Sequence, residues 1–109
     1  PADSGSRLYN YDGNLDLAQG TGFMAIGYGG SNLADACEAS QLWLFNPSDT
    51  TFVKHFMLRG SGNLKNSIHG NNHNIAAGYF NTTSAIDAIQ FKYATDEIQG
   101  GSIKMYGIA

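Results

Sequence analysis

Apolar and polar residues between positions 41 and 58 follow a pattern that predicts a β-hairpin. The apolar run from Leu42 to Phe45 ends at Asn46-Pro47-Ser48-Asp49, where proline fixes φ and where Asn and Asp favour a turn. Large apolar side chains resume over residues 52–58, with Phe56 and Leu58 on one parity. Two apolar segments that flank such a turn predict a pair of antiparallel strands.

Three segments further along the chain are also predicted to be strands. Residues 75–80 are apolar, and residues 85–93 show the clearest alternation in the chain, with Phe91 and Tyr93 on one side and Lys92 between them. Alternation returns over residues 102–108. Strands at intervals of roughly 8 to 15 residues are typical of antiparallel sandwiches, so we expect an all-β, jelly-roll-like β-sandwich.

The other segments are predicted to be irregular. Residues 13–30 contain six glycines. Because glycine weakens a strand interior, the N-terminal third is expected to pack as irregular chain with short β pieces. A short helix over residues 31–40 is compatible with their composition but is not required by it. Residues 60–74 are rich in Gly, Ser and Asn and are predicted to form a long loop, a feature that is usually functional or mobile.

Length and charge restrict the classes of protein and partner that fit the chain. Its 109 residues correspond to one domain, 1–109, and its net charge of −3 comes with six basic residues that form no cluster. Binding to a nucleic-acid backbone needs a concentrated basic surface, so nucleic acid is not an expected partner. No apolar run is long enough to span a membrane, and the first residues do not read as a signal peptide. The single cysteine, Cys37, permits no intrachain disulfide and fits a reducing cytoplasm, and a free cysteine is usually buried in a core or interface.

The predicted loop carries the candidate binding residues: His69, Asn71, Asn72 and His73. Asn amides offer paired donors and acceptors to a sugar, so a surface-binding loop of this kind could take a host glycan. The two histidines, with His55 as a third ligand, would also form a metal site. Zinc usually has three or four protein ligands, and we therefore favour solvated loop histidines and expect no bound metal.

No set of residues in the sequence indicates catalysis. Cys37 lies between Asp35 and Glu38, whose negative charges disfavour a thiolate, and Asp96 and Glu97 are adjacent instead of facing each other across a cleft. We expect no enzymatic activity, no catalytic residues and no cofactor. Four aromatic residues are expected to supply the core, because burial of each stabilises a small domain by about 1.5 to 3 kcal/mol; they are Trp43, Phe45, Phe52 and Phe56.

Three blocks of sequence resemble virion structural proteins of marine tailed phages. They are Leu44-Phe45-Asn46-Pro47-Ser48-Asp49-Thr50-Thr51-Phe52-Val53-Lys54-His55-Phe56, Ala77-Gly78-Tyr79-Phe80-Asn81-Thr82-Thr83-Ser84-Ala85-Ile86-Asp87-Ala88-Ile89-Gln90-Phe91-Lys92 and Gly101-Ser102-Ile103-Lys104-Met105-Tyr106-Gly107-Ile108. Asp16-Leu17-Ala18-Gln19 resembles a block that lies upstream in that family. Longer members carry further β-rich sequence before this region, so the chain is either a compact version or the C-terminal part of a longer architecture.

The resemblance implies a role in the virion, assembled in the host cytoplasm. The leading hypothesis is a capsid decoration or cement protein that contacts the major capsid protein of the head lattice, where many copies give firm attachment. The alternative is a tail-fibre or appendage tip domain that binds a host-surface glycan. Unpaired sheet edges predict a homo-oligomer, and a trimer is favoured because trimers are common in capsids and fibres.

Overall fold

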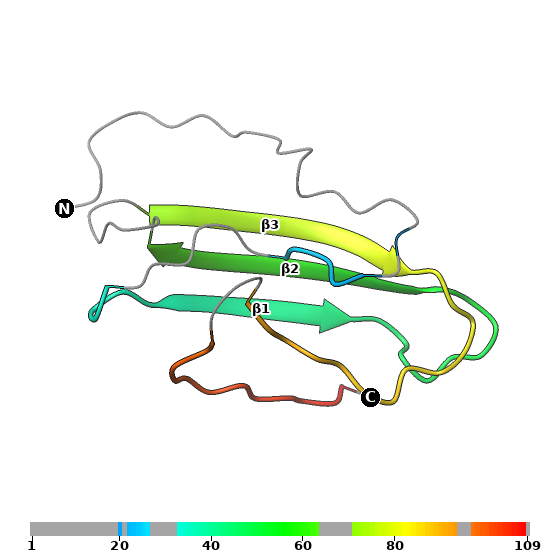
Figure 1. Cartoon of the computed structure of the whole chain (residues 1–109). Coiled ribbons are helices and arrows are strands. Elements are labelled where there is room, and N and C mark those ends of the chain that lie inside the picture. The colour runs from blue at the N-terminus through cyan, green and yellow to red at the C-terminus, as the bar shows by residue number, and fades with distance from the viewer. Residues whose placement is uncertain (1–19, 21, 27–32, 64–70, 94–96, 109) are drawn as a thin grey trace.

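The structured part of the chain is an antiparallel β-sheet. The computed structural model describes residues 20, 22–26, 33–63, 71–93 and 97–108 (Figure 1). Within them, β1 (Glu38–Leu44), β2 (Lys54–Asn63) and β3 (Asn71–Phe80) form one sheet in the order β1-β2-β3. The described residues include no helix, and none that could cross a membrane. Antiparallel β structure is therefore confirmed for this part of the chain, whereas the sandwich and jelly roll stay predictions.

The predicted hairpin joins β1 to β2. Asn46 adopts a left-handed φ of 46°, which asparagine tolerates well, and the N–H of Asp49 donates to its carbonyl at 3.1 Å. The Asp49 carboxylate accepts the N–H groups of Thr51 at 2.6 Å and Phe52 at 2.7 Å. Because these bonds, that of Phe52 first, stabilise the charged form, they hold the pKa of Asp49 below its usual value of 3.8. The turn is thus fixed by the residues that predict it.

The predicted long loop over residues 60–74 is wrong, because strands occupy most of it. β2 continues to Asn63 and β3 begins at Asn71, and these two residues are cross-strand partners. Glycine is needed at position 60 for a close approach: a Cβ there would lie 2.8 Å from the Cβ of its partner Ser40. A glycine that usually indicates a loop therefore sits inside a strand. The connection 64–70, with His69, lies outside the described residues.

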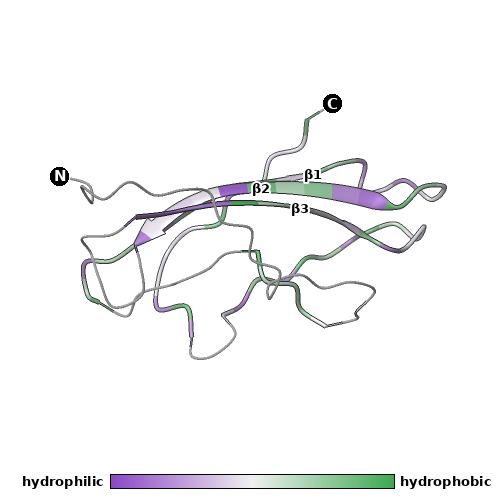
Figure 2. Ribbon diagram, turned by 90° about the horizontal axis from the view of Figure 1, so that it is seen from above, coloured by the Kyte–Doolittle hydropathy of each residue, from purple (hydrophilic) through white to green (hydrophobic). Residues whose placement is uncertain are grey.

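The two faces of the sheet differ in how far the chain covers them. Along β2, Lys54, Phe56 and Leu58 are buried, whereas each residue that alternates with them is exposed. The covered face carries these buried residues, and contacts join it to segments 22–26 and 85–93, through Met24 beside Gly78 and through Tyr93, which donates to Glu38. The Met24 methyl group lies 3.7 Å from a Cβ built on Gly78. Figure 2 shows most of the remaining described chain on one side of the sheet.

Short-range and long-range hydrogen bonds hold these segments in place. The buried Lys54 ammonium donates to the carbonyls of Phe52 at 3.0 Å and Thr82 at 3.3 Å, which ties the end of β3 to the start of β2. The N–H of Ile86 donates to the carbonyl of Pro47 at 2.7 Å, so the start of segment 85–93 is anchored on the hairpin turn.

The predicted strands over residues 85–93 and 102–108 are not formed. Neither segment forms the regular backbone hydrogen bonds of a strand. Ile89 and Phe91 are nevertheless half-buried, as their alternation predicts. Alternation reports that one side of an extended segment is buried, whereas a strand also needs a neighbour to share its backbone hydrogen bonds. The helix considered for residues 31–40 is absent from the described residues as well: Ala36 closes a turn on Leu33 at 3.1 Å, and β1 begins at Glu38.

Candidate functional site

The side of the sheet opposite the covered face, which we call the open face, is the main candidate for a functional surface. Its residues come from all three strands and from the residues directly before and after β1, and lie in cross-strand rows. The rows are Phe45, His55 and Tyr79; Trp43, Met57 and Ala77; Gln41, Arg59 and Ile75; Ala39, Ser61 and His73; and Cys37, Asn63 and Asn71.

One end of the open face is apolar. Its large side chains remain between 40% and 63% exposed: Trp43, Phe45, Met57, Ile75 and Tyr79. Their exposed surface amounts to about 500 Å², if each side chain offers roughly 200 Å². A patch of this size is at the upper end for a monomer and often has a function.

Of the four aromatic residues predicted to form the core, only Phe56 is buried; the prediction is wrong for Trp43, Phe45 and Phe52. Trp43 and Phe45 lie on the open face, and Phe52 lies in the bend before β2. Apolar composition alone did not distinguish the covered face from the open one, because the strands carry large side chains on both.

The other end of the open face is polar and hollow. An open depression of about 560 Å³ is lined by Ala39, Ser40, Gln41, Arg59, Gly60, Ser61 and His73. Among the described strand residues of the open face, Arg59 is the only Lys, Arg, Asp or Glu. The hollow therefore offers a guanidinium, an imidazole and an amide, groups that suit hydroxyl or anionic partners. Ser61 and His73 are cross-strand partners in the hollow, but the Ser61 hydroxyl donates to Asn71 Oδ1 at 2.8 Å and not to the imidazole.

The residues predicted to form one binding loop are divided between the two faces of the sheet. Asn71 and His73 lie on the open face, where the Ser61 hydroxyl donates to Asn71 Oδ1 at 2.8 Å, whereas Asn72 lies between them on the covered face. They belong to β3, so the predicted loop is wrong for these three residues, whereas their role in binding stays a prediction. The period-two alternation of strands could have revealed this, but four polar residues at 71–74 masked it.

The described histidines do not form a metal site. His55 lies beside Tyr79, with ring centroids 5.8 Å apart, while His73 is opposite Ser61. The six positions between His55 and Ser61 on β2 correspond to about 20 Å, so the two imidazoles cannot share an ion. Among the described residues, no group of three His, Cys, Asp or Glu side chains could hold a metal.

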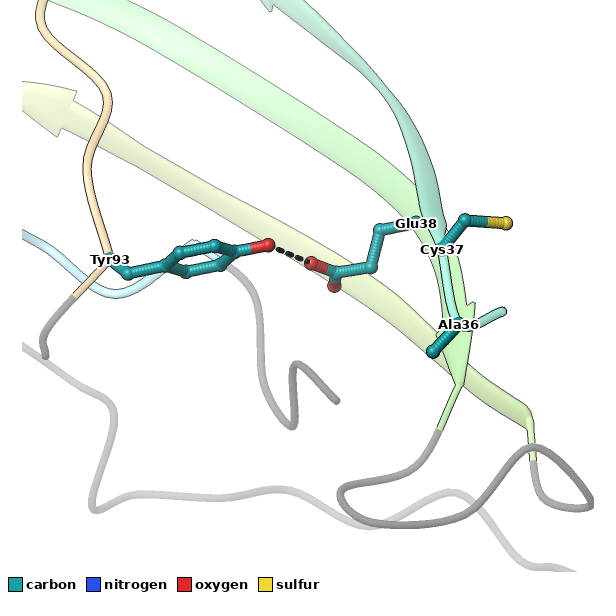
Figure 3. A pocket seen from close by; sticks show the side chains of 4 residues that line it. All are labelled: Ala36, Cys37, Glu38 and Tyr93. Carbon is teal, nitrogen blue, oxygen red and sulfur yellow. Dashed lines mark hydrogen bonds between the residues drawn. The ribbon is translucent and has the colours of Figure 1, made fainter. Parts of the chain in front are cut away.

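A second, smaller cavity lies where segment 85–93 reaches β1 (Figure 3). It measures about 40 Å³ and is lined by Ala36, Cys37, Glu38 and Tyr93. The Tyr93 hydroxyl donates to Glu38 Oε2 at 3.4 Å, and burial, followed by the Glu38 carboxylate, raises the pKa of Tyr93 above 10.0. This contact links segment 85–93 to the sheet and places no reactive group near another.

Cys37 is not part of the core, since its side chain is exposed. Its N–H donates to Asn63 Oδ1 at 2.9 Å, and its sulfur points away from Glu38 and Tyr93 (Figure 3). The thiol thus lies on the surface near the start of β1.

Comparison with protein-family models, curated proteins and solved structures found no match in any of the three. The interpretation of the open face therefore depends on its geometry, together with the resemblance in the sequence blocks.

Proposed function

We propose that this chain is a structural domain of a phage virion, a capsid decoration or cement protein, and that the open face is its assembly surface. The observation that carries the proposal is the apolar end of the open face, whose large side chains are exposed in the described part of the chain. The phage context comes from the resemblance alone.

The energetics of the sheet favour a covered open face. Phe56 and Leu58 are the only buried apolar residues among those described, so the core of this part is small. Removal of about 500 Å² of apolar surface from water contributes about 12 kcal/mol before other costs. The loss of translational and rotational freedom on association costs about 4 to 15 kcal/mol, so the net affinity of a single contact is modest. Many such contacts on one lattice together give firm attachment.

The same reasoning supports the predicted β-sandwich. A second β layer on the open face would turn the single sheet into two packed sheets, with the apolar residues of the open face in the core. We propose that another virion subunit supplies this layer, either the major capsid protein or a further copy of the chain. The trimer that the resemblance favours stays a prediction. The domain acts in the virion, after assembly in the host cytoplasm, without catalysis or cofactor.

Quantitative mass spectrometry of purified virions tests the proposal. A decoration protein is expected at hundreds of copies per particle, in a fixed ratio to the major capsid protein. A count of only a few copies per particle would exclude the head-lattice role.

The tail-fibre or appendage tip domain remains the second candidate, and the polar hollow is the observation that favours it. Arg59, Gln41 and His73 line the hollow, and Trp43 lies one row from Gln41. Donors beside an aromatic ring suit a glycan. The test is host adsorption by phage that carries Arg59→Ala and His73→Ala: unchanged adsorption would exclude this role for the hollow.

A further inference from the structure

We infer that the open face packs on the open face of a second copy of this chain, with the apolar ends overlapping and the strands of the two copies antiparallel. The two-fold axis then runs across the strands close to Met57. The inference rests on the proposed role in assembly and deepens it by naming the partner.

The composition of the open face is that of an interface core. Such cores are rich in aromatic residues, Met and Arg and poor in Lys, Asp and Glu. The described strand residues of the open face match this pattern, with Arg59 as the only Lys, Arg, Asp or Glu among them. None of the described acidic residues belongs to the cross-strand rows of the open face; they are Asp35, Glu38, Asp49, Asp87 and Glu97.

This charge distribution favours the same surface over an acidic partner. An acidic partner would meet only Arg59, and its other carboxylates would be buried without partners against Trp43 and Met57, which is unfavourable. The described strand residues on the open face of a second copy bring no carboxylate. In such a pair, the apolar side chains of one copy pack against the apolar side chains of the other.

The area agrees with what a stable pair of chains requires. A standard interface buries about 800 Å² on each partner, and homodimer interfaces are about 65% apolar. The apolar end supplies about 500 Å² of this area, and the exposed residues Gln41, His55 and Arg59 adjoin it on the same face.

The antiparallel orientation follows from the position of Arg59. Arg59 lies two residues from Met57 along β2, or about 7 Å. With the strands antiparallel, the two guanidinium groups are about 13 Å apart along the strands, in addition to the roughly 10 Å between packed sheets. They are then separated by more than a Debye length of about 8 Å, whereas parallel strands would stack them.

Sedimentation of the purified chain gives the first test, with Trp43 as an internal reporter. Trp43 is the only tryptophan and lies on the open face, so its emission should shift to shorter wavelength as the concentration rises and the dimer forms. Met57→Glu should raise the dissociation constant more than about tenfold, because it buries a charge at the axis. The matched control, Ile103→Glu, changes a 71% exposed apolar residue outside the sheet and should leave the dimer intact.

Cross-linking gives a second test that does not depend on the fold of the Met57→Glu variant. In a Cys37→Ser background, Met57→Cys places a thiol near the axis, and Ala39→Cys places one at the polar end of the same face. Ala39 faces Ser61, four positions from Met57, so its two copies are roughly 26 Å apart along the strands. A short bismaleimide should therefore link Met57→Cys into dimers at least tenfold faster than Ala39→Cys.

Four outcomes would overturn the inference: a monomer at all concentrations, a trimeric mass, equal cross-linking of the two thiols, or a dimer lost in Ile103→Glu but kept in Met57→Glu. The last would assign the contact to the C-terminal segment. None of them changes the copy number in the virion, which tests the proposed function separately.

Discussion

Gly78 in β3 lies beneath the ring of Phe56, and Gly78→Ala is expected to destabilise the sheet. The two residues are cross-strand partners on the covered face. A Cβ at position 78 would lie 2.8 Å from Phe56 Cε1 and 2.9 Å from Cζ, closer than carbon atoms approach without strain. Phe56 is buried and packs on Phe80 at a centroid distance of 5.5 Å, so its ring has little room to move.

The expected magnitude comes from two opposing effects. An extra methyl group forced into a packed site costs about 1 to 3 kcal/mol. Alanine is otherwise better than glycine in a strand by about 0.5 to 1 kcal/mol, because glycine loses more conformational entropy on folding. The middle of the two ranges gives a net loss of about 1 kcal/mol, which lowers the Tm of a domain of this size by about 4 to 8 °C.

Thermal unfolding followed by circular dichroism, at one fixed protein concentration, measures this loss. Gly107→Ala is the matched control, because nothing lies within 4 Å of a Cβ there and its φ is not positive. It should leave the Tm unchanged or raise it slightly. In a Phe56→Leu background, where the ring is gone, the cost of Gly78→Ala should largely disappear. A Gly78→Ala protein as stable as the parent, or a cost that persists without the ring, would refute the reasoning.

Three further changes test the contacts that hold the turn and the covering segment. Lys54→Met should lower the free energy of unfolding by about 1 to 3 kcal/mol in denaturant titration, because the carbonyls of Phe52 and Thr82 lose a charged donor; no loss would mean that the bonds do not matter. Asp49 has a lowered pKa, so its contribution is complete above pH 3.8 and is lost as the pH falls through the folded pKa. Asp49→Ala should therefore lower the Tm at pH 7 and flatten its decline in acid, and an unaltered acid profile would contradict this role. Glu38→Gln should lower the pKa of Tyr93 in an NMR titration, whereas an unchanged pKa would leave burial as its sole cause.

The sequence was most informative where a few adjacent residues determine the structure. The turn at Asn46-Pro47-Ser48-Asp49 could be located because its hydrogen bonds join residues within a few positions of each other. The prediction failed for residues 60–63 and 71–74, where the preferences of Gly and Asn for loops are overridden by cross-strand pairing. It also failed for residues 85–93, whose alternation is real but which pair with no strand in the described part of the chain.

The candidate site was predicted only in part. His73 was selected from the sequence for its chemistry, and it lines the polar hollow. Gln41 and Arg59 line the same hollow, but the sequence did not indicate them. These three residues belong to three strands, so only the register brings them together. The exposure of Trp43 could not be foreseen either, since it depends on which face the remaining chain covers.

The strict alternation along β2 has a consequence for how substitutions will be tolerated. Adjacent residues of β2 have different roles. The covered face takes Lys54, Phe56 and Leu58, whereas the open face takes His55, Met57 and Arg59. In a library of all single substitutions, selection for soluble, folded protein should deplete variants at the first set and spare the second. Selection for particle assembly should deplete both. The difference between the two profiles, read codon by codon, would map the assembly surface without any knowledge of the partner.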